Sequence, residues 1–433
     1  MEDLSEPLLG EIITRITRTS DLNSLSLVSK RLYNVEAEER ATLRVGCDLT
    51  LSFCSCIDNS GLGYLSYCKK LMALRLNAVP AITSGGLLSV AVGCKSLSTL
   101  HLTDCMKVGS VEAVVPQHEC ERLWYGTPIQ QKKMRIRCPG DSGMEWLEYL
   151  GKTGSLVDLV VKDCKGISQY DLLKFGPGWM KLEKFEFEIN DNYWLSGPPL
   201  DPSYNVDYPY KYDICCNNMK DLRLAKIITV PEIGLRFLLG QCRALEKLCL
   251  HYVVGLDESQ MITLFQNCRN LRSISLQLMP LRCGFSFRTP LTDDSLETLS
   301  HCCPMLEVVE LTFAFCSSTY PTEIGFTQKG IITLVQTCPT CVFVLNGARI
   351  FKDEGMKDIS SAQFLETLEL VDCKGIADVG ISYMKLESLT VVGCRLISEE
   401  AVQGAARSVR YSSELESQDS LKGMKMARIV SKE

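Results

Sequence analysis

The residue types that could support catalysis are present in this chain, but not at the spacings that common catalytic motifs use. The 433 residues contain no HExxH, GxSxG or GxxxxGK[ST] sequence, the motifs of zinc peptidases, α/β-hydrolases and P-loop NTPases. The one CxxC pair, Cys338 and Cys341, lacks the second pair of ligands that a zinc site needs. We therefore expect no active site, no metal and no cofactor. The four histidines are scattered, at His101, His118, His251 and His301.

Charge and hydropathy narrow the choice of partners. The chain carries 46 lysines and arginines against 52 aspartates and glutamates, a formal net charge of -6. This balance argues against nucleic acid or an anionic membrane as the main partner. Met1 is followed by Glu2 and Asp3, not by a basic and then apolar leader, and no apolar run is long enough to cross a bilayer. We expect a protein of the cytoplasm and/or nucleus that binds proteins or small molecules.

A repeated phrase organises most of the chain. The sequence LxxLxL begins at Leu71 and again at Leu97, 26 residues later, and a cysteine stands three positions before each copy, Cys68 or Cys94. Repeats of this length are units that bury an apolar face only by stacking on neighbours. Each apolar-x-apolar pair predicts a short strand with one buried face. The pairs are Leu49/Leu51, Leu74/Leu76, Leu100/Leu102, Leu159/Val161, Phe185/Phe187, Leu222/Leu224, Leu248/Leu250, Ile274/Leu276, Val309/Leu311, Leu368/Leu370 and Leu389/Val391, with a weaker copy at Val344.

A signal for the start of a helix follows most of these strands. It is an apolar residue followed, in most copies, by an aspartate, serine or threonine that can cap the first free amides. The signals are Ile57-Asp58, Ile82-Thr83, Ile167-Ser168, Leu256-Asp257, Leu291-Thr292, Phe326-Thr327, Phe351-Lys352 and Ile397-Ser398. Strand, turn and helix together resemble the cysteine-containing leucine-rich repeat over residues 49–402. The resemblance implies an α/β solenoid, spanning 46–402, with a concave parallel sheet and convex helices.

The cysteines fit the same repeat. The chain has 22 of them, many at fixed positions among the leucines. So many cysteines would suggest disulfides in a secreted protein. At repeat positions in a reducing compartment, we expect them to be small buried apolar side chains.

The residue between the two apolar positions of each strand should point into the concavity. These residues share no chemistry, which suits one particular protein partner better than a repetitive polymer. They are Arg75, His101, Val160, Glu186, Arg223, Cys249, Ser275, Glu310, Glu369 and Thr390.

The period is broken most strongly between Leu97 and Leu156. These residues are 59 positions apart, which is one period of 26 plus 33, and deleting residues 113–145 restores the register. Our hypothesis is an insertion from a retained intron or an extra exon, so that this chain is an irregularly spliced isoform. The alternative is a basic binding loop, with Lys132, Lys133, Arg135 and Arg137.

Three other repeats are long, and in all of them the excess follows the strand. Loops that leave a solenoid at one edge often mark its binding face. The first of them, 188–217, combines aromatic residues with prolines that stiffen the chain, the usual composition of an interface hot spot. The alternative is that these aromatic residues cover strands left bare by a missing helix. They include Tyr193, Trp194, Tyr204, Tyr208, Tyr210 and Tyr212.

The first 45 residues have helical spacing. Leu4, Leu8, Ile12 and Ile16 stand four apart and form one apolar stripe. After a break at residues 19–21, a second amphipathic stretch follows. The segment LSEPLLGEIITRITRTSDLNSLSLVSKRLYNV resembles an F-box, although Ser5 stands where proline is usual. The alternative is a helical cap on the first repeat. The resemblance implies that a Skp adaptor binds Leu4, Pro7, Leu8, Ile12, Ile16, Leu25, Val28, Lys30 and Tyr33.

An F-box ahead of leucine-rich repeats is similar to the plant-like members of the F-box/leucine-rich-repeat family. The resemblance implies a non-catalytic subunit of an SCF-type cullin-RING ubiquitin ligase, in which the repeats capture a target protein. Two alternatives stay open: a small-molecule co-receptor, which would need a basic ring inside the horseshoe, and a scaffold without a ligase role. Residues 403–433 are expected to be a polar tail.

Overall fold

The computed structural model describes residues 47–109, 143–189, 216–227, 239, 241–253, 256–278, 291–313 and 325–414. The F-box-like segment 1–45, most of the predicted insertion and the aromatic loop residues at 190–215 lie outside these ranges. The described residues form a sheet of 13 strands in sequence order, and all neighbouring strands are parallel. This order confirms the predicted α/β leucine-rich-repeat solenoid.

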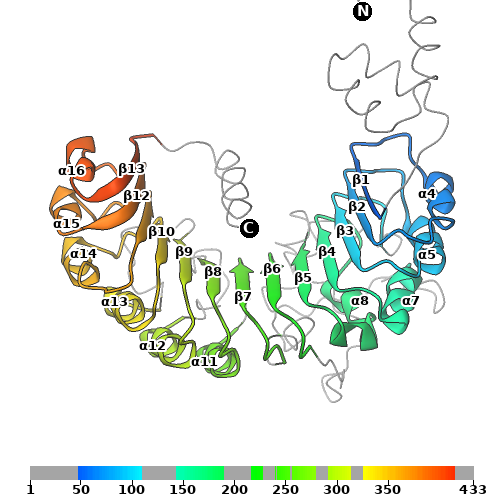
Figure 1. Ribbon diagram of the computed structural model, residues 1–433, viewed down its shortest axis with the longest axis horizontal. Helices are drawn as coiled ribbons and strands as arrows, with labels where there is room; N and C mark the ends of the chain where they lie inside the picture. The colour runs from blue at the N-terminus through cyan, green and yellow to red at the C-terminus, as the bar shows by residue number, and fades with distance from the viewer. Residues whose placement is uncertain are drawn as a thin grey trace, which may run out of the picture.

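The sheet lines the inner side of an arc and the helices lie on its outer side (Figure 1). Each strand is short because its repeat supplies only one LxL phrase, and curvature follows from strands being thinner than the helices behind them. The strands are β1 (Asp48–Ser52), β2 (Ala73–Asn77), β3 (Thr99–Thr103), β4 (Asp158–Lys162), β5 (Lys184–Glu188), β6 (Asp221–Ala225), β7 (Lys247–His251), β8 (Ser273–Leu278), β9 (Val308–Phe313), β10 (Val342–Asn346), β11 (Thr367–Val371), β12 (Leu386–Val392) and β13 (Ala406–Ser412).

Helices begin where the sequence predicts their caps. The side chains of Asp58, Thr83 and Thr292, for example, accept hydrogen bonds from amides in the first turn that follows. The helical elements are α4 (Asn59–Leu65), α5 (Ser84–Gly93), α7 (Glu145–Thr153), α8 (Gln169–Leu173), the 3₁₀ helix η1 (Gly176–Met180), α11 (Glu258–Asn267), α12 (Asp293–Cys302), α13 (Gln328–Thr337), α14 (Asp353–Ile359), α15 (Asp378–Ser382) and α16 (Glu399–Gln403).

The first residue of one helix often holds the cap of the next. Asp293, which opens α12, accepts hydrogen bonds from the amide and the hydroxyl of Thr327, at 2.9 and 2.8 Å. Asp378 accepts from Ser398 in the same way, at 2.6 and 3.0 Å. Neighbouring repeats are therefore joined by hydrogen bonds along the helical side as well as by the sheet.

The core is a continuous stack of leucine side chains between sheet and helices. Leu74, Leu100 and Leu159 occupy the same register position on β2, β3 and β4 and are fully or almost fully buried. Buried cysteines add to it, as predicted. The Cys268 thiol, for example, donates to the Cys242 carbonyl of the preceding repeat at 3.4 Å. Such thiols fill space without leaving a polar group unpaired.

The predicted insertion does not interrupt the sheet. His101 pairs with Val160 in the β3–β4 register, so these strands are direct neighbours. The last two residues of the predicted insertion belong to the folded repeat. Met144 is fully buried and Glu145 begins α7, because the apolar face of that helix, which includes Trp146, must pack in the core.

The boundary of the C-terminal tail needs a similar correction. β13 pairs with β12 in parallel as far as Ser412, so the solenoid continues beyond the predicted end at residue 402. A weak phrase explains the error: Val409 and Tyr411 stand where leucines would be expected, and both pack against the core.

The long repeats leave the solenoid at one edge. β5, β8 and β9 precede the undescribed ranges 190–215, 279–290 and 314–324, and because all strands run in the same direction their ends lie at the same edge of the sheet. The predicted aromatic loop should begin later than residue 188, since Glu188 is the last residue of β5.

Candidate protein-binding surface

One row of side chains crosses the whole concave face. The LxL leucines point into the core, so the residue between them points to the opposite side of the sheet. Strand register places these residues side by side. In order they are Thr50, Arg75, His101, Val160, Glu186, Arg223, Cys249, Ser275, Glu310, Val344, Glu369, Thr390 and Arg410. We call this set the concave row.

Asp158 links three strands at the N-terminal part of the row. Its Oδ2 lies 2.9 Å from Nε2 of His101 on β3 and 3.6 Å from Nζ of Lys184 on β5. Burial alone would raise the pKa of the Asp158 carboxyl, but the hydrogen bond and charge of His101, aided by Lys184, outweigh burial and lower it. The aspartate is therefore held in its charged form.

The next strands carry a chain of alternating charges. Nζ of Lys162 lies 2.9 Å from Oε1 of Glu186 and 3.7 Å from Oε2 of Glu188. Nζ of Lys226 lies 3.0 Å from Oε1 of Glu188. Burial would lower the pKa of Lys162, but the charges of the two glutamates and the hydrogen bond to Glu186 raise it. These groups fix one another's positions before any partner arrives, which lowers the ordering cost of binding.

Arg223 is held by a carboxylate on its own strand. Its Nε and Nη2 donate to the two oxygens of Asp221, at 2.9 and 3.1 Å. This bidentate hydrogen bond raises the pKa of the guanidinium despite burial. Arg223 therefore presents a fixed cation at the centre of the concave row.

Uncharged groups dominate β7 and β8. The Ser275 hydroxyl donates to the Glu310 carboxylate at 3.0 Å and lies 3.0 Å from Nε2 of His251. Beside Ser275, burial raises the pKa of the Cys249 thiol to about 12. The thiol thus stays protonated at neutral pH and is a poor nucleophile, although it faces the concavity.

The ion pairs argue against the alternative of a small-molecule co-receptor with a basic ring inside the horseshoe. A basic ring that holds a polyphosphate needs cations without anionic neighbours. Lys162, Lys184 and Arg223, on β4, β5 and β6, and Lys226, which follows β6, each already have a carboxylate within 4 Å. From β4 to β6 the surface is therefore charged but internally neutralised, which fits the polar surface of a protein partner better.

The sequence predicts the row and, beside it, Lys162, but the flanking residues Asp158 and Lys184 were missed. Asp158, Lys162 and Lys184 stand two positions from row residues, so the two-residue period of a strand puts them on the same face. That period was the signal that could have found them. The row members Thr50, Val344 and Arg410 were also missed. The strands of Val344 and Arg410 have weak phrases, whereas Thr50 lies between Leu49 and Leu51 of a predicted strand and could have been included.

The remaining site predictions fall outside the described residues. They are the nine adaptor-binding positions between Leu4 and Tyr33 and the loop aromatic residues from Tyr193 to Tyr210. Within the described ranges, no group of three or more histidine, cysteine, aspartate or glutamate side chains is arranged to hold a metal ion. In the same ranges, the helices are too short or too polar to cross a membrane.

Comparison with known proteins adds a distant likeness of fold. No family model matches the chain. Among solved structures it is similar to the crystal structure of the Rad7 and Elc1 complex in yeast, with 17% identity and a TM-score of 0.46 over 93% of this chain and 92% of that one. It is also similar to an internalin from Listeria monocytogenes, with 11% identity and a TM-score of 0.41 over 90% and 93%. Likenesses this distant say nothing about what this chain binds.

Proposed function

We propose that this chain is the substrate-recognition subunit of an SCF-type cullin-RING E3 ubiquitin ligase. Residues 1–45 dock the Skp adaptor, and through it a cullin, while the solenoid captures a target protein for ubiquitination and degradation. The observation that carries the proposal is the order of two units. A segment with the apolar stripe Leu4, Leu8, Ile12 and Ile16 directly precedes a solenoid whose first strand begins at Asp48.

The concave row supports the second half of the proposal. Pre-positioned charges such as Arg223 and Glu186 favour one complementary partner and penalise others, because a group of like charge on a wrong partner would be buried beside them. Val160 and Val344 interrupt the charges with buried apolar side chains. Such a mixture suits one protein surface.

The proposed role requires no catalytic residue in this chain. A ligase subunit that holds its target beside a ubiquitin-charged enzyme accelerates the reaction by raising the effective concentration of the two reactants. The protonated Cys249 thiol is in keeping with a binding role. We propose that this happens in the cytoplasm and/or nucleus.

The adaptor half is tested with purified components. The full chain and its Leu8→Ala/Ile12→Ala variant are compared for binding to recombinant Skp adaptor by isothermal titration calorimetry. Removing two stripe side chains should weaken binding at least about 100-fold, since each large apolar anchor contributes about 1.5–3 kcal/mol. Thr14→Ala is the control, because position 14 is half a helical turn from Ile12 and off the stripe.

The result separates the ligase from the scaffold alternative. Loss of adaptor binding in the double variant, with Thr14→Ala unchanged, supports the ligase role. Equal adaptor binding by wild type and double variant, or none by wild type, would remove the ligase role and leave the scaffold.

A further inference from the structure

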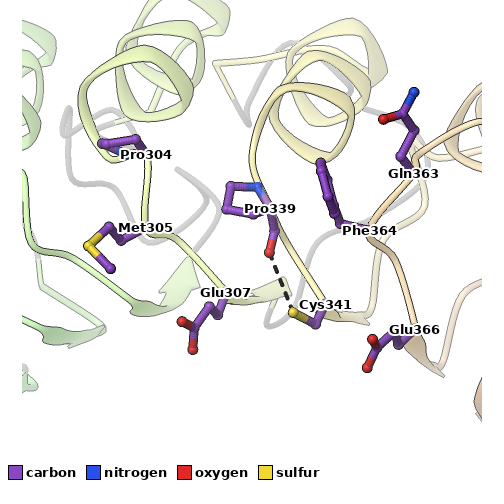
Figure 2. A pocket seen from close by; sticks show the side chains of 8 residues that line it. All are labelled: Pro304, Met305, Glu307, Pro339, Cys341, Gln363, Phe364 and Glu366. Carbon is purple, nitrogen blue, oxygen red and sulfur yellow. Dashed lines mark hydrogen bonds between the residues drawn. The ribbon is translucent and has the colours of Figure 1, made fainter.

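A groove lies away from the concave row, at the edge of the sheet where strands begin. It is formed by the residues just before β9, β10 and β11 and has a volume of ≈ 380 Å³. Figure 2 shows the carboxylates of Glu307 and Glu366 at one end of the groove and the rings of Pro339 and Phe364 beside them. We call it the edge groove.

The wall of the edge groove is apolar and open to solvent. The Phe364 side chain is 53% exposed and Met305 is 41% exposed, and Pro304 and Pro339 lie next to them. Aromatic and methionine side chains are enriched in protein interfaces, where they supply contact area at little ordering cost. The apolar wall therefore offers a surface for a partner's apolar side chain.

Other charges at the starts of strands are paired across neighbouring repeats. Oε2 of Glu183 lies 2.8 Å from Nζ of Lys220, and Oε1 of Glu307 lies 2.6 Å from Nη1 of Arg272. These residues stand immediately before β5, β6, β8 and β9. With Glu246, which stands immediately before β7, they alternate in charge along this edge.

Glu366 breaks this pattern. It stands immediately before β11, but the residue before β10 is Cys341, where continued alternation would place a lysine or arginine. Within the described ranges no basic side chain pairs with the Glu366 carboxylate, whereas the carboxylate of Glu387, the second residue of β12, lies 2.9 Å from the guanidinium of Arg407. The edge groove therefore has an uncompensated negative charge at one end.

The backbone at this place has no capacity for an added strand. The amides of Glu366 and Thr367 both donate to the Cys341 carbonyl, at 3.0 and 2.8 Å, and the amides of Cys341 and Val342 donate to that of Glu307, at 2.9 and 3.0 Å. A partner must therefore bind the edge groove through side chains.

We propose that the edge groove binds a peptide segment of a partner protein that presents an arginine next to an apolar side chain. The guanidinium pairs with Glu366 and stacks against the Phe364 ring, a geometry that planar arginine favours. The neighbouring apolar side chain covers Met305 and Pro339. The proposal does not depend on the ligase role, because it concerns another surface and makes no use of residues 1–45.

The test uses the full chain and pools of short fluorescent peptides with random flanks and a fixed central pair. The Arg-Leu pool should bind, whereas the Glu-Leu and Arg-Ser pools should bind at least about tenfold more weakly, the effect of about 1.4 kcal/mol. Fluorescence anisotropy at low and high salt should show that binding of the Arg-Leu pool weakens with salt.

Variants locate the binding. Glu366→Gln and Phe364→Ala should each weaken binding of the Arg-Leu pool about tenfold, while Glu387→Gln, the matched carboxylate on the next repeat, should leave it unchanged. All three positions are exposed, so equal melting temperatures are expected. Absence of Arg-Leu binding at about 1 mM chain, or equal binding by Glu366→Gln and wild type, would overturn the proposal.

Discussion

His101 and Asp158 are 57 residues apart in the chain, yet their side chains meet at 2.9 Å on adjacent strands. The contact shows that β3 and β4 are direct neighbours in the sheet despite the long sequence separation between them. The concave row is therefore continuous across the predicted insertion, and the same contact predicts a pH effect.

The substitution Asp158→Asn should lower the free energy of unfolding mainly above pH 4. The folded pKa of Asp158 is lowered, so its stabilising contribution is complete above the unfolded value of about 3.9 and is lost as the pH falls through the folded pKa. We expect a loss of about 1 kcal/mol at pH 7, because the pair is partly exposed to solvent. Urea unfolding midpoints of wild type and variant should converge as the pH falls below about 4. A gap that stays constant down to acid pH would contradict this.

The alternation of the strands predicts opposite outcomes for neighbouring residues. Leu74→Ala leaves a cavity in the leucine stack and should cost about 2–5 kcal/mol. Arg75→Ala, one residue later on the concave face, should change the free energy of unfolding by less than about 0.5 kcal/mol. Urea denaturation followed by circular dichroism measures both. Similar losses for the two variants would contradict the assigned strand faces.

The contribution of the hydrogen bonds between helix caps to stability can be measured by replacing each of two neighbouring aspartates. Asp293→Ala removes the acceptor of two hydrogen bonds from Thr327 and should destabilise the chain by about 1–2 kcal/mol. Asp294→Ala is the control. It removes a negative charge from the same first turn of α12, and therefore the same favourable interaction with the helix N-terminus, but it removes no hydrogen bond to Thr327. The difference between their thermal unfolding midpoints reports the contacts between repeats, and no difference would show that these contacts contribute nothing.

Buried and exposed cysteines should differ in their rate of alkylation. Burial raises the pKa of Cys268 and of Cys303 to about 12, so neither thiol forms the reactive thiolate near pH 8. Cys47 and Cys56 are exposed. Iodoacetamide followed by mass spectrometry should modify the exposed pair in minutes and the buried pair only after denaturation. Rapid modification of Cys268 in the folded chain would contradict its placement in the core.

Most of the fold could be predicted from short sequence patterns. Caps such as Thr292 and Asp257 were identified because a short oxygen-bearing side chain before an apolar helix has few other roles. β13 was missed because Val409 and Tyr411 replace leucines, so that pairing with β12, not the phrase itself, decides its structure.

The candidate site was only partly visible in the sequence. Spacing identifies which residues face the concavity, but not which of them pair, because pairing depends on the register of strands far apart in the chain. Lys162 and Glu186 meet only through the β4–β5 register. The edge groove was not foreseen at all, since it depends on loops from three repeats meeting at one edge.

We propose that one chain binds an adaptor through its first 45 residues and a target through the concave row. Both interactions can be compared by quantitative mass spectrometry of the proteins that co-purify with three forms of the chain: wild type, Leu8→Ala/Ile12→Ala and Arg75→Glu/Glu369→Arg. We predict that the first variant loses the Skp adaptor and cullin but retains the target proteins, and that the second does the reverse. Retention of the adaptor by the first variant at the wild-type level, together with an unchanged set of proteins on the second, would contradict the claim.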